Sequence, residues 1–426
     1  MTSHQEASAN LSPVWIHYTP VVASRGEGCY IYDQDEVPYL DFTCGIAVTN
    51  TGHCHPKVVE AIRKQAGLLI HGQINIVVHE PILELVEQLR TIVHPSIDGF
   101  FFSNSGAEAI EGAMKLARHA TGRTNIIVFQ GSFHGRTVGT MSLTTSKTIY
   151  RQGYQPLMPG VFVAPFPYSY RYGWDDEQTS QWCLEELDYL LTTQTAPHET
   201  AAILIEPILG EGGYVVPPAS FMQGLRRVCD QHGILLILDE VQTGLGRTGR
   251  WFGYDHFGIK PDIITVAKGL ASGLPISGVF SRLELMEKWT PGTHGGTFGG
   301  NVVAAAAGVA TLQAMKDENM PGNATERGSQ LFTGLRHLQE EYPTMGDVRG
   351  LGLMIGTEFR TPQGKPDKNT AKAIVHACLD RKLMLLTCGP WDNTVRWIPP
   401  LIVSAEQIDH ALAVFKDALG EVIGKE

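Results

Sequence analysis

Two short apolar runs, residues 234–238 and 263–267, constrain the fold more than any other feature of this chain. Neither run alternates with polar residues, which is typical of strands buried on both faces of a parallel sheet. Asp239 follows the first run and Lys268 follows the second. Because ligands of such sheets bind beyond the carboxyl ends of the strands, we expect these two side chains to lie at one edge of one sheet.

An acid and a lysine at the same sheet edge have a specific chemical use. A lysine forms a Schiff base with a carbonyl group, and a carboxylate keeps a pyridinium nitrogen protonated. Pyridoxal 5'-phosphate (PLP) needs both of these from a protein. An ordinary salt bridge between strand ends is the alternative, and Asp239 and Lys268 alone leave it open.

The strand–loop–helix pattern repeats over a long part of the chain and predicts an α/β domain with a mostly parallel sheet. The expected strands are 99–103, 125–130, 160–164 and 201–206 besides the two runs above, and the expected helices are 107–120, 184–191, 221–232 and 302–315. A smaller α+β unit is expected after them, with helices near 326–340, 370–381 and 405–419 and strands at 353–359, 383–387 and 395–398.

The chain is long enough for two to three domains. We expect residues 1–56 to join the smaller domain, residues 57–322 to form the large cofactor-binding domain, and residues 323–426 to form the C-terminal small domain. Within the first segment, residues 1–20 are expected to be a flexible lead, and a strand, a turn and a strand follow it.

Composition narrows the class of protein further. The net charge of −11 disfavours nonspecific binding to nucleic acid or to an anionic membrane surface. No apolar run approaches the ~20 residues of a membrane span, and the polar N-terminus has no signal-peptide pattern. Seven scattered cysteines fit a reducing compartment, so a cytoplasmic protein is expected.

The first candidate binding motif is S-N-S-G-A-E-A at the end of the expected strand 99–103. Small residues there allow close approach of a ligand, and a helix N-terminus favours a phosphate. Ser105, Gly106 and Ala107 are the expected contacts. Capping of the helix by Ser105, with Glu108 three residues later, is the structural alternative.

Two further loops follow expected strands. In F-H-G-R-T, Phe133 could stack on a flat ring, His134 could help to position it, and Arg136 could bind a carboxylate through two parallel hydrogen bonds. In E-P-I-L-G-E-G-G, Glu206 ends a strand at the same sheet edge as Asp239, and we expect it to contact the substrate. Glu211 lies in the glycine-rich part, where it could respond to the charge of a substrate or be simply solvated.

Two further motifs suggest a zinc site and a dinucleotide-binding site, but each is weak evidence. The T-G-H-C-H-P stretch holds two histidines and a cysteine, but a loop without a second cluster is poor evidence for zinc, so no metal is expected. The glycines at 244, 246 and 249 match a dinucleotide-binding pattern. That pattern requires a strand directly before it and a helix opening within it, and neither is expected here.

In sequence order these motifs resemble those of the class III, fold-type I, PLP-dependent aminotransferases. The resemblance covers nearly the whole chain and, within the family, is nearest to the 4-aminobutyrate aminotransferases. Its motifs are T-G-H-C-H-P, S-G-A-E-A, F-H-G-R-T, the strand end E-P, L-D-E-V-Q-T-G, A-K-G-L and G-G-T-F-G-G-N.

The resemblance implies roles for the residues that contact PLP. Lys268 would hold the cofactor as a Schiff base and later carry the proton between substrate and cofactor. Asp239 would pair with the pyridinium nitrogen, Gln242 would contact the ring hydroxyl oxygen, and Phe133 would stack on the ring. Thr297 would complete the phosphate site from the neighbouring subunit, which implies a homodimer with shared active sites.

The resemblance also implies how substrates would bind. Arg136 would hold the carboxylate of an ω-amino acid, and Ile46 would shape the pocket. Arg396 would pair with Glu211 while the amine end of the donor is bound. When 2-oxoglutarate arrives, Glu211 would swing away and Arg396 would bind the α-carboxylate. Leu209 departs from the pattern, since many of these aminotransferases carry glutamine there.

The leading hypothesis is therefore an aminotransferase that moves an amino group from an ω-amino acid to 2-oxoglutarate by a ping-pong mechanism. An aminotransferase whose donor is acetylornithine or ornithine is a variant of the same hypothesis. A PLP-dependent amino-acid racemase is the alternative, because it would use the same lysine and aspartate. The aromatic stretch 165–174 could line an entrance or pack a loop, and it leaves the donor open.

Overall fold

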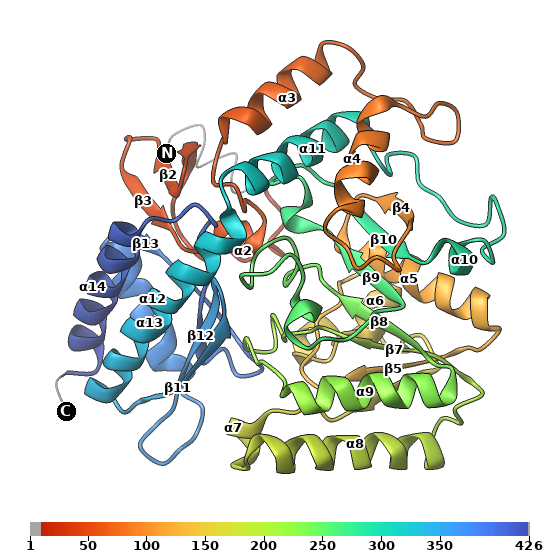
Figure 1. Cartoon of the computed structure of the whole chain (residues 1–426). Helices are drawn as coiled ribbons and strands as arrows, with labels where there is room; N and C mark the ends of the chain where they lie inside the picture. Colours follow the sequence, from red (N-terminus) through yellow and green to blue (C-terminus); the bar gives the residue numbers. More distant parts are fainter. Residues whose placement is uncertain (1–9, 425–426) are drawn as a thin grey trace.

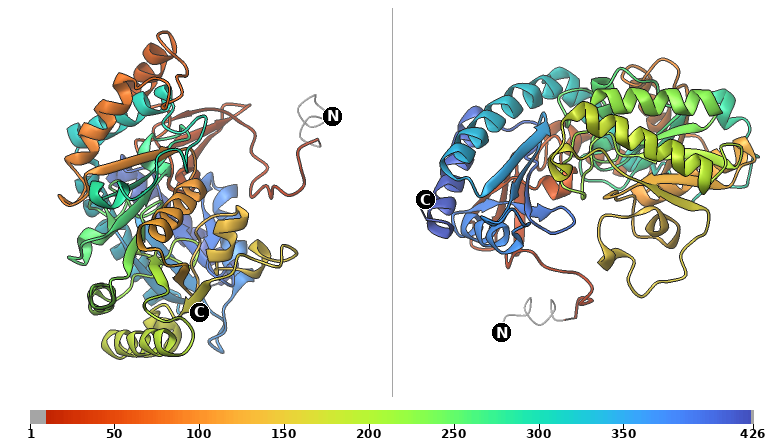
Figure 2. Two further views of the ribbon diagram at one scale, coloured as in Figure 1. Left: turned by 90° about the vertical axis from the view of Figure 1, so that its right-hand side faces the viewer. Right: turned by 90° about the horizontal axis from the view of Figure 1, so that it is seen from below.

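A computed structural model of the chain describes residues 10–424. The chain forms two lobes, a large one built around a twisted sheet and a smaller one that contains the C-terminal elements (Figures 1 and 2). Of the expected N-terminal lead, residues 1–9 lie outside the described residues. No helix within residues 10–424 is long and apolar enough to cross a membrane.

The sheet of the large lobe has the strand order β4-β10-β9-β8-β7-β5-β6. Every pair from β9 to β6 is parallel, and β10 is antiparallel to both of its neighbours. All residues of β7, β8 and β9 are buried, as their mainly apolar sequences predict. The strands are β4 Gly99–Ser103, β5 Asn125–Phe129, β6 Val161–Ala164, β7 Thr200–Ile205, β8 Leu235–Asp239, β9 Ile263–Val266 and β10 Ser277–Ser281.

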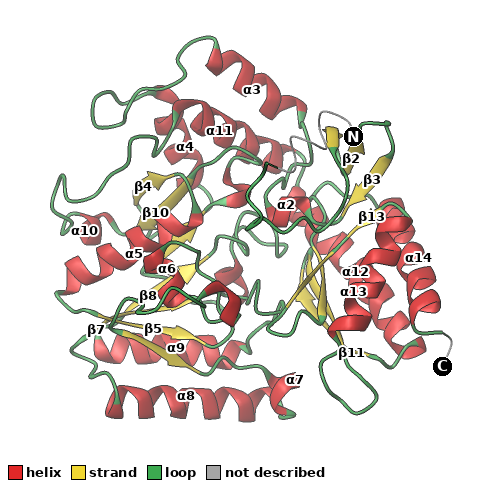
Figure 3. Ribbon diagram, turned by 180° about the vertical axis from the view of Figure 1, so that it is seen from behind, coloured by secondary structure: helices red, strands yellow, loops and turns green. Residues whose placement is uncertain are grey.

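Helices cover both faces of this sheet (Figure 3). Helices α8 and α9 pack against each other on one side, whereas α5 contacts β7, β9 and β10 from the other. Helix α11 packs against α3 and α4 beyond the β4 edge. The helices of this lobe are α3 Pro56–Ala66, α4 Glu80–Arg90, α5 Gly106–Thr121, α6 Val138–Leu143, α7 Ser169–Tyr172, α8 Asp176–Thr193, α9 Ala219–His232, α10 Leu283–Met286 and α11 Val302–Asp317.

The smaller lobe contains an antiparallel sheet of order β11-β12-β15-β14 with α12, α13 and α14 beside it. A second sheet, of order β1-β2-β3-β13, joins the two ends of the chain, because β3 pairs in parallel with β13. The elements are β1 Ala23–Glu27, β2 Tyr30–Asp33, β3 Pro38–Asp41, α2 Cys44–Ala47, α12 Met320–Glu341, β11 Met345–Leu351, β12 Met354–Phe359, α13 Lys368–Asp380, β13 Leu383–Met384, β14 Leu386–Cys388, β15 Thr394–Trp397 and α14 Ala405–Val422.

The sequence prediction of an α/β fold with a mostly parallel sheet and a smaller α+β unit is confirmed, with local differences. The expected strand 383–387 is two strands, β13 and β14, that belong to different sheets. Helix α12 begins at Met320, about six residues earlier than expected. The proposed division into residues 1–56, 57–322 and 323–426 stays a proposal, and its second boundary falls in the first turn of α12.

Candidate active site

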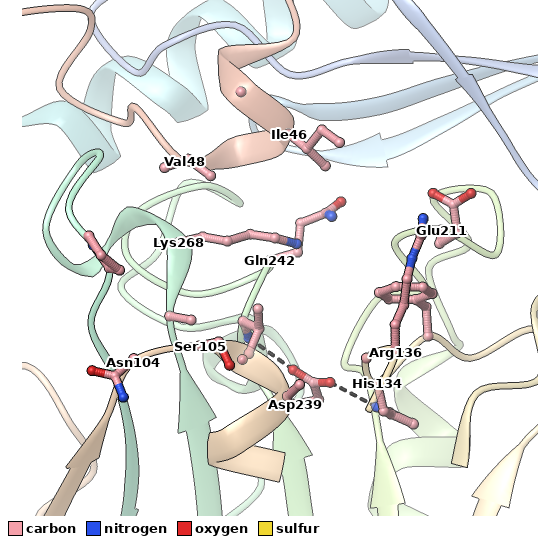
Figure 4. Close-up of a pocket in the computed structure, with 18 of the residues that line it drawn as sticks. Ile46, Val48, Asn104, Ser105, His134, Arg136, Glu211, Asp239, Gln242 and Lys268 are labelled. Carbon is pink, nitrogen blue, oxygen red and sulfur yellow. Dashed lines mark hydrogen bonds and ion pairs between the residues drawn. The ribbon is translucent and has the colours of Figure 1, made fainter. Parts of the chain in front are cut away.

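A cavity of about 670 Å³ lies at the carboxyl edge of the large sheet. Its lining comes from the loops after β4, β5, β7, β8 and β9, and it also includes Ile46 and Arg396 of the smaller lobe. Figure 4 shows Lys268 extending toward Gln242 in the middle of the cavity, with Arg136 and Glu211 together on one side. A sheet edge closed by a second lobe is a typical place for a ligand in α/β proteins.

Asp239 lies at the end of β8 and is held in one orientation. Its Oδ2 is 2.7 Å from Nδ1 of the buried His134, and its Oδ1 accepts a hydrogen bond of 3.1 Å from the Val241 N–H. The Thr265 hydroxyl lies 3.5 Å from the same Oδ1. Only 4% of Asp239 is exposed, so the carboxylate is fixed by hydrogen bonds rather than by water.

Lys268 follows β9 and lies in the cavity wall. Its backbone has a φ of +42°, a left-handed conformation that is uncommon for a lysine and is found at functional sites. Burial lowers the pKa of Lys268 from 10.5 to about 8, although the carboxylates of Asp239 and Glu206 act in the opposite direction. A lysine with a lowered pKa is more often neutral, and the neutral amine is the form that attacks a carbonyl.

Helix α5 opens into the same cavity. Ser105 is its N-cap, and Ser105 and Glu108 form a reciprocal capping box, so the capping alternative is confirmed, while the phosphate contacts stay a prediction. The N–H groups of Gly106 and Ala107, as the first residues of the helix, have no intrahelical acceptor. A Cβ atom on Gly106 would lie 3.1 Å from a Val241 methyl group, so the helix start is closely packed. These features suit a phosphate.

Glu206 lines the cavity but uses both of its oxygens within the protein. Oε1 accepts a 2.8 Å hydrogen bond from the Phe133 N–H, and Oε2 accepts one of the same length from the Gly210 N–H. Burial, together with the nearby Asp239, raises the pKa of Glu206 to about 7. The side chain therefore ties two active-site loops together.

Arg136 is an exposed cation at the cavity wall. Its guanidinium carbon lies 4.6 Å from the centre of the Tyr150 ring and 5.9 Å from that of Phe133. No carboxylate within residues 10–424 pairs with it. An arginine that is held by aromatic rings and has no acidic partner can accept the carboxylate of a ligand.

Arg396 on β15 is a second cation of the cavity, and it is paired. Its Nη1 lies 3.1 Å from Oε2 of Glu211. Oε1 of Glu211 also accepts hydrogen bonds of 2.8 Å from Lys147 Nζ and from the Tyr150 hydroxyl. Burial alone would raise the pKa of Glu211, but Arg396 and Lys147 lower it below its usual value, so the group is ionised.

Ile46 reaches the cavity from an unusual backbone segment. Residues 44–47 all have positive φ, between +50° and +65°, although only one of them is glycine. Such a run is strained for L-residues. The Asp41 carboxylate stabilises it by accepting hydrogen bonds from the Thr43 and Cys44 N–H groups, and Asp41 is in turn contacted by His53.

The residues present fit PLP. The Gln242 Oε1 atom is buried in the cavity wall and has no hydrogen-bond partner in the described part of the chain. The same is true of His134 Nε2. Unpaired buried polar atoms are costly, and a bound polar ligand would satisfy a group that faces the cavity. A lysine with a lowered pKa, an oriented carboxylate and a free helix N-terminus surround the same space. Each matches one functional group of the cofactor.

Thirteen of the candidate residues named from the sequence line this one cavity, and their roles stay predictions: Ile46, Ser105, Gly106, Ala107, Phe133, His134, Arg136, Glu206, Glu211, Asp239, Gln242, Lys268 and Arg396. Thr297 is exposed and does not line the cavity of its own chain. Sequence reasoning missed Lys147 and Tyr150, which have no distinctive motif. It also missed Tyr18, which lines the cavity although it belongs to the expected flexible lead.

Leu209 and the aromatic stretch 165–174, which left the identity of the amino donor open, lie outside the main cavity. Leu209, Phe166, Tyr168 and Tyr172 line a separate cavity of about 250 Å³ together with Trp391. None of them lines the main cavity.

The two weak motifs have structural roles. His53 contacts Asp41, and His55 lies 3.0 Å from Glu318. In the glycine motif at 244–249, Arg247 is fully buried and donates hydrogen bonds to the Leu353 and Pro399 carbonyls of the smaller lobe. The motif joins the two lobes.

This fold and this site define a PLP-dependent enzyme, and comparison with known proteins gives the family. The family model of the class III aminotransferases matches residues 11–419, and the chain belongs to this family. It is 39% identical over 406 residues to a 5-aminovalerate aminotransferase of Pseudomonas aeruginosa. This match covers 95% of this chain and 94% of the relative. It is 40% identical over 410 residues to a 4-aminobutyrate aminotransferase of Escherichia coli, with 94% of each chain covered.

Solved structures agree with this assignment. An (S)-enantioselective ω-transaminase of Thermomicrobium roseum superposes with a TM-score of 0.91 at 31% identity, covering 99% of this chain and 98% of the other.

Other relatives in sequence are named for different substrates or reactions. An acetylornithine aminotransferase of Gloeobacter violaceus is 40% identical over 98% of this chain and 97% of its own, and an alanine/serine racemase of Pyrococcus horikoshii is 36% identical over 95% and 86%. The protein is a PLP-dependent aminotransferase.

Proposed function

We propose that the enzyme transfers the amino group of an ω-amino acid, such as 4-aminobutyrate or 5-aminovalerate, to 2-oxoglutarate by a ping-pong mechanism. The observation that carries this proposal is the different state of the two arginines. Arg136 is exposed and has no acidic partner among the described residues 10–424, whereas Arg396 is buried and paired with Glu211. Relatives named for 4-aminobutyrate and 5-aminovalerate support the choice of donor.

The two arginines would serve two different substrates. The donor has one carboxylate, which Arg136 would bind, and its amine end needs no second cation, so Glu211 would stay on Arg396. The acceptor has two carboxylates. Its α-carboxylate would replace Glu211 on Arg396, because one buried guanidinium cannot hold both anions in the same geometry. One pocket could thus accept both substrates.

The cofactor supplies an aldehyde carbon that takes up the amino group and a protonated ring that withdraws electrons from the reacting bond. Lys268 would hold PLP and, once released, move the proton at the reacting carbon. Asp239, oriented by His134, would keep the ring nitrogen protonated. The N–H groups of Gly106 and Ala107, with Ser105, would bind the phosphate, and Gln242 and Phe133 would orient the ring.

We also propose that the enzyme is a homodimer in which Thr297 of each chain completes the phosphate site of the other. Thr297 is exposed and lies outside the cavity of its own chain, and the neighbouring Phe298 is 60% exposed. Large apolar side chains are also exposed before α4, namely Leu68, Ile70, Ile76 and Val78. An exposed apolar patch of this kind is typical of a subunit interface.

A cytoplasmic location is proposed from the seven cysteines, all of which are unpaired.

The test is a panel of donors with 2-oxoglutarate as acceptor, in which glutamate formation is measured. We expect turnover with 4-aminobutyrate or 5-aminovalerate. When pyruvate, a monocarboxylic 2-oxo acid, replaces 2-oxoglutarate, alanine is measured in place of glutamate, and we expect little of it to form. If N-acetylornithine is the one donor of the panel that is turned over, the enzyme is an acetylornithine aminotransferase, like the relative of 40% identity.

Racemisation is the second candidate, because a relative named alanine/serine racemase matches 95% of the chain. A racemase would return the proton to the substrate carbon and would leave the amino group on the substrate. Loss of optical activity of L-alanine or L-serine, without glutamate formation from any donor, would therefore establish racemisation.

A further inference from the structure

Lys147 contacts the carboxylate that pairs with Arg396. Its Nζ lies 2.8 Å from Oε1 of Glu211 and 2.5 Å from Oδ1 of Asp392. The side chains of Lys147 and Glu211 are only 12% and 14% exposed, so little water competes with this pair. Lys147 follows α6 in the large lobe, whereas Asp392 lies between β14 and β15 of the smaller lobe.

The two oxygens of Glu211 serve two different cations. Oε2 faces Arg396, while Oε1 is shared by Lys147 and the Tyr150 hydroxyl. Breaking the contact with Arg396 would thus leave the carboxylate with a positive partner and a hydroxyl donor. Burial alone would lower the pKa of Lys147, but Glu211 and Asp392 raise it above its usual value, so the ammonium stays charged.

We propose that Lys147 is a positioning residue that holds Glu211 after it leaves Arg396, and that it thereby determines how well the enzyme binds a dicarboxylate. The inference rests on the proposed exchange of Glu211 for the α-carboxylate of the acceptor. Removing one partner of a buried ion pair leaves an unpaired charge, which is costly. Without Lys147, Arg396 would be the one cation left beside Glu211 among residues 10–424, and Glu211 would compete more strongly with the acceptor for it.

The inference predicts an effect on one class of ligand only. Glutarate resembles 2-oxoglutarate without the reactive oxo group, and pentanoate has the same carbon chain with one carboxylate. In Lys147→Met we expect glutarate to bind at least about tenfold more weakly, since 1.4 kcal/mol already corresponds to a tenfold change in Kd. Pentanoate does not need Arg396, so its Kd should change by less than about threefold.

The measurement is isothermal titration calorimetry of both ligands with the PLP-loaded enzyme. Lys147→Arg keeps the charge and should bind glutarate like the wild type, whereas Lys147→Gln keeps a hydrogen-bond donor without the charge and should resemble Lys147→Met. Lys368→Met is the matched control, because Lys368 pairs with Asp392 at 2.9 Å but does not contact Glu211. It should leave both affinities unchanged.

A double substitution separates positioning from a general effect on folding. In Glu211→Gln the competing negative charge is absent, so adding Lys147→Met should no longer weaken glutarate binding. An equal loss of affinity for glutarate and pentanoate in Lys147→Met, or unchanged glutarate binding, would overturn the inference.

The proposed function is tested separately by Arg396→Met. If wild type and Arg396→Met bind glutarate equally, Arg396 is not the acceptor site, and both proposals are wrong. If Arg396→Met loses glutarate binding while Lys147→Met keeps it, the proposed function stands and the role of Lys147 is refuted.

Discussion

Replacing His134 by phenylalanine tests how Asp239 is held. The substitution keeps a ring of similar size in a buried position and removes the nitrogen that lies 2.7 Å from Asp239 Oδ2. Asp239 would keep the Val241 N–H at 3.1 Å and the more distant Thr265 hydroxyl. The Asp239 carboxylate would therefore lose the hydrogen bond at Oδ2, which is its shortest, and keep those at Oδ1.

The size of the effect follows from the energy of this hydrogen bond. Hydrogen bonds to charged groups contribute about 1.5–3 kcal/mol. At 1.36 kcal/mol per factor of ten, this corresponds to about 10- to 150-fold. We expect a loss of this size in the affinity of the apoenzyme for PLP, and a similar decrease in the rate of the first half-reaction with the amino donor.

The assay is a titration of the apoenzyme with PLP, followed by stopped-flow absorbance with the donor. His256→Phe is the control, because His256 is partly buried and contacts the Thr248 carbonyl but does not line the cavity. If His134→Phe folds normally and both quantities stay within threefold of the wild type, then His134 does not position Asp239 and our reasoning is wrong.

Three further predictions concern the cavity. Lys268→Ala should abolish the Schiff-base absorbance and reduce turnover to background, and unchanged turnover would refute the assignment of Lys268. Because burial lowers the pKa of Lys268 to about 8, the rate at which apoenzyme captures PLP should rise with pH, with a midpoint near pH 8. A midpoint near 10.5, the value of an ordinary lysine, would contradict this. Arg136→Met should raise KM for the ω-amino acid by about 10- to 150-fold through loss of a charged hydrogen bond, with little effect on butylamine, which has no carboxylate; an equal effect on both would show that Arg136 does not bind the carboxylate.

Much of the large lobe could be predicted because its signals are local. The apolar runs before Asp239 and Lys268 are buried strands, and the small residues at Gly106 do open a helix. Strand β10 was missed, because S-G-V-F-S is short and glycine-containing and is stabilised by its two neighbouring strands. Strand β11 contains two glycines and two charged residues, which hides its pattern.

The site residues that sequence reasoning missed depend on contacts between distant segments. Lys147 and Glu211 are 64 residues apart, and Lys147 and Asp392 are 245 apart, so neither contact has a local signal. The left-handed turn that presents Ile46 contains a single glycine, and the hydrogen bonds of Asp41 stabilise it. The start of α12 was placed too late, because the proline and glycine of M-P-G-N suggest a loop, although a proline is tolerated in the first turn of a helix.

The central claim is that an ω-amino acid donates its amino group to the cofactor and that 2-oxoglutarate takes it away. The most direct measurement follows the absorbance of the PLP-loaded enzyme during a single turnover, first with 4-aminobutyrate or 5-aminovalerate and no acceptor. We predict conversion of the cofactor to its amine form, and its return to the aldehyde form when 2-oxoglutarate is added. If neither donor changes the absorbance, while L-alanine or L-serine loses optical activity on the same enzyme, the account is contradicted and the enzyme is a racemase.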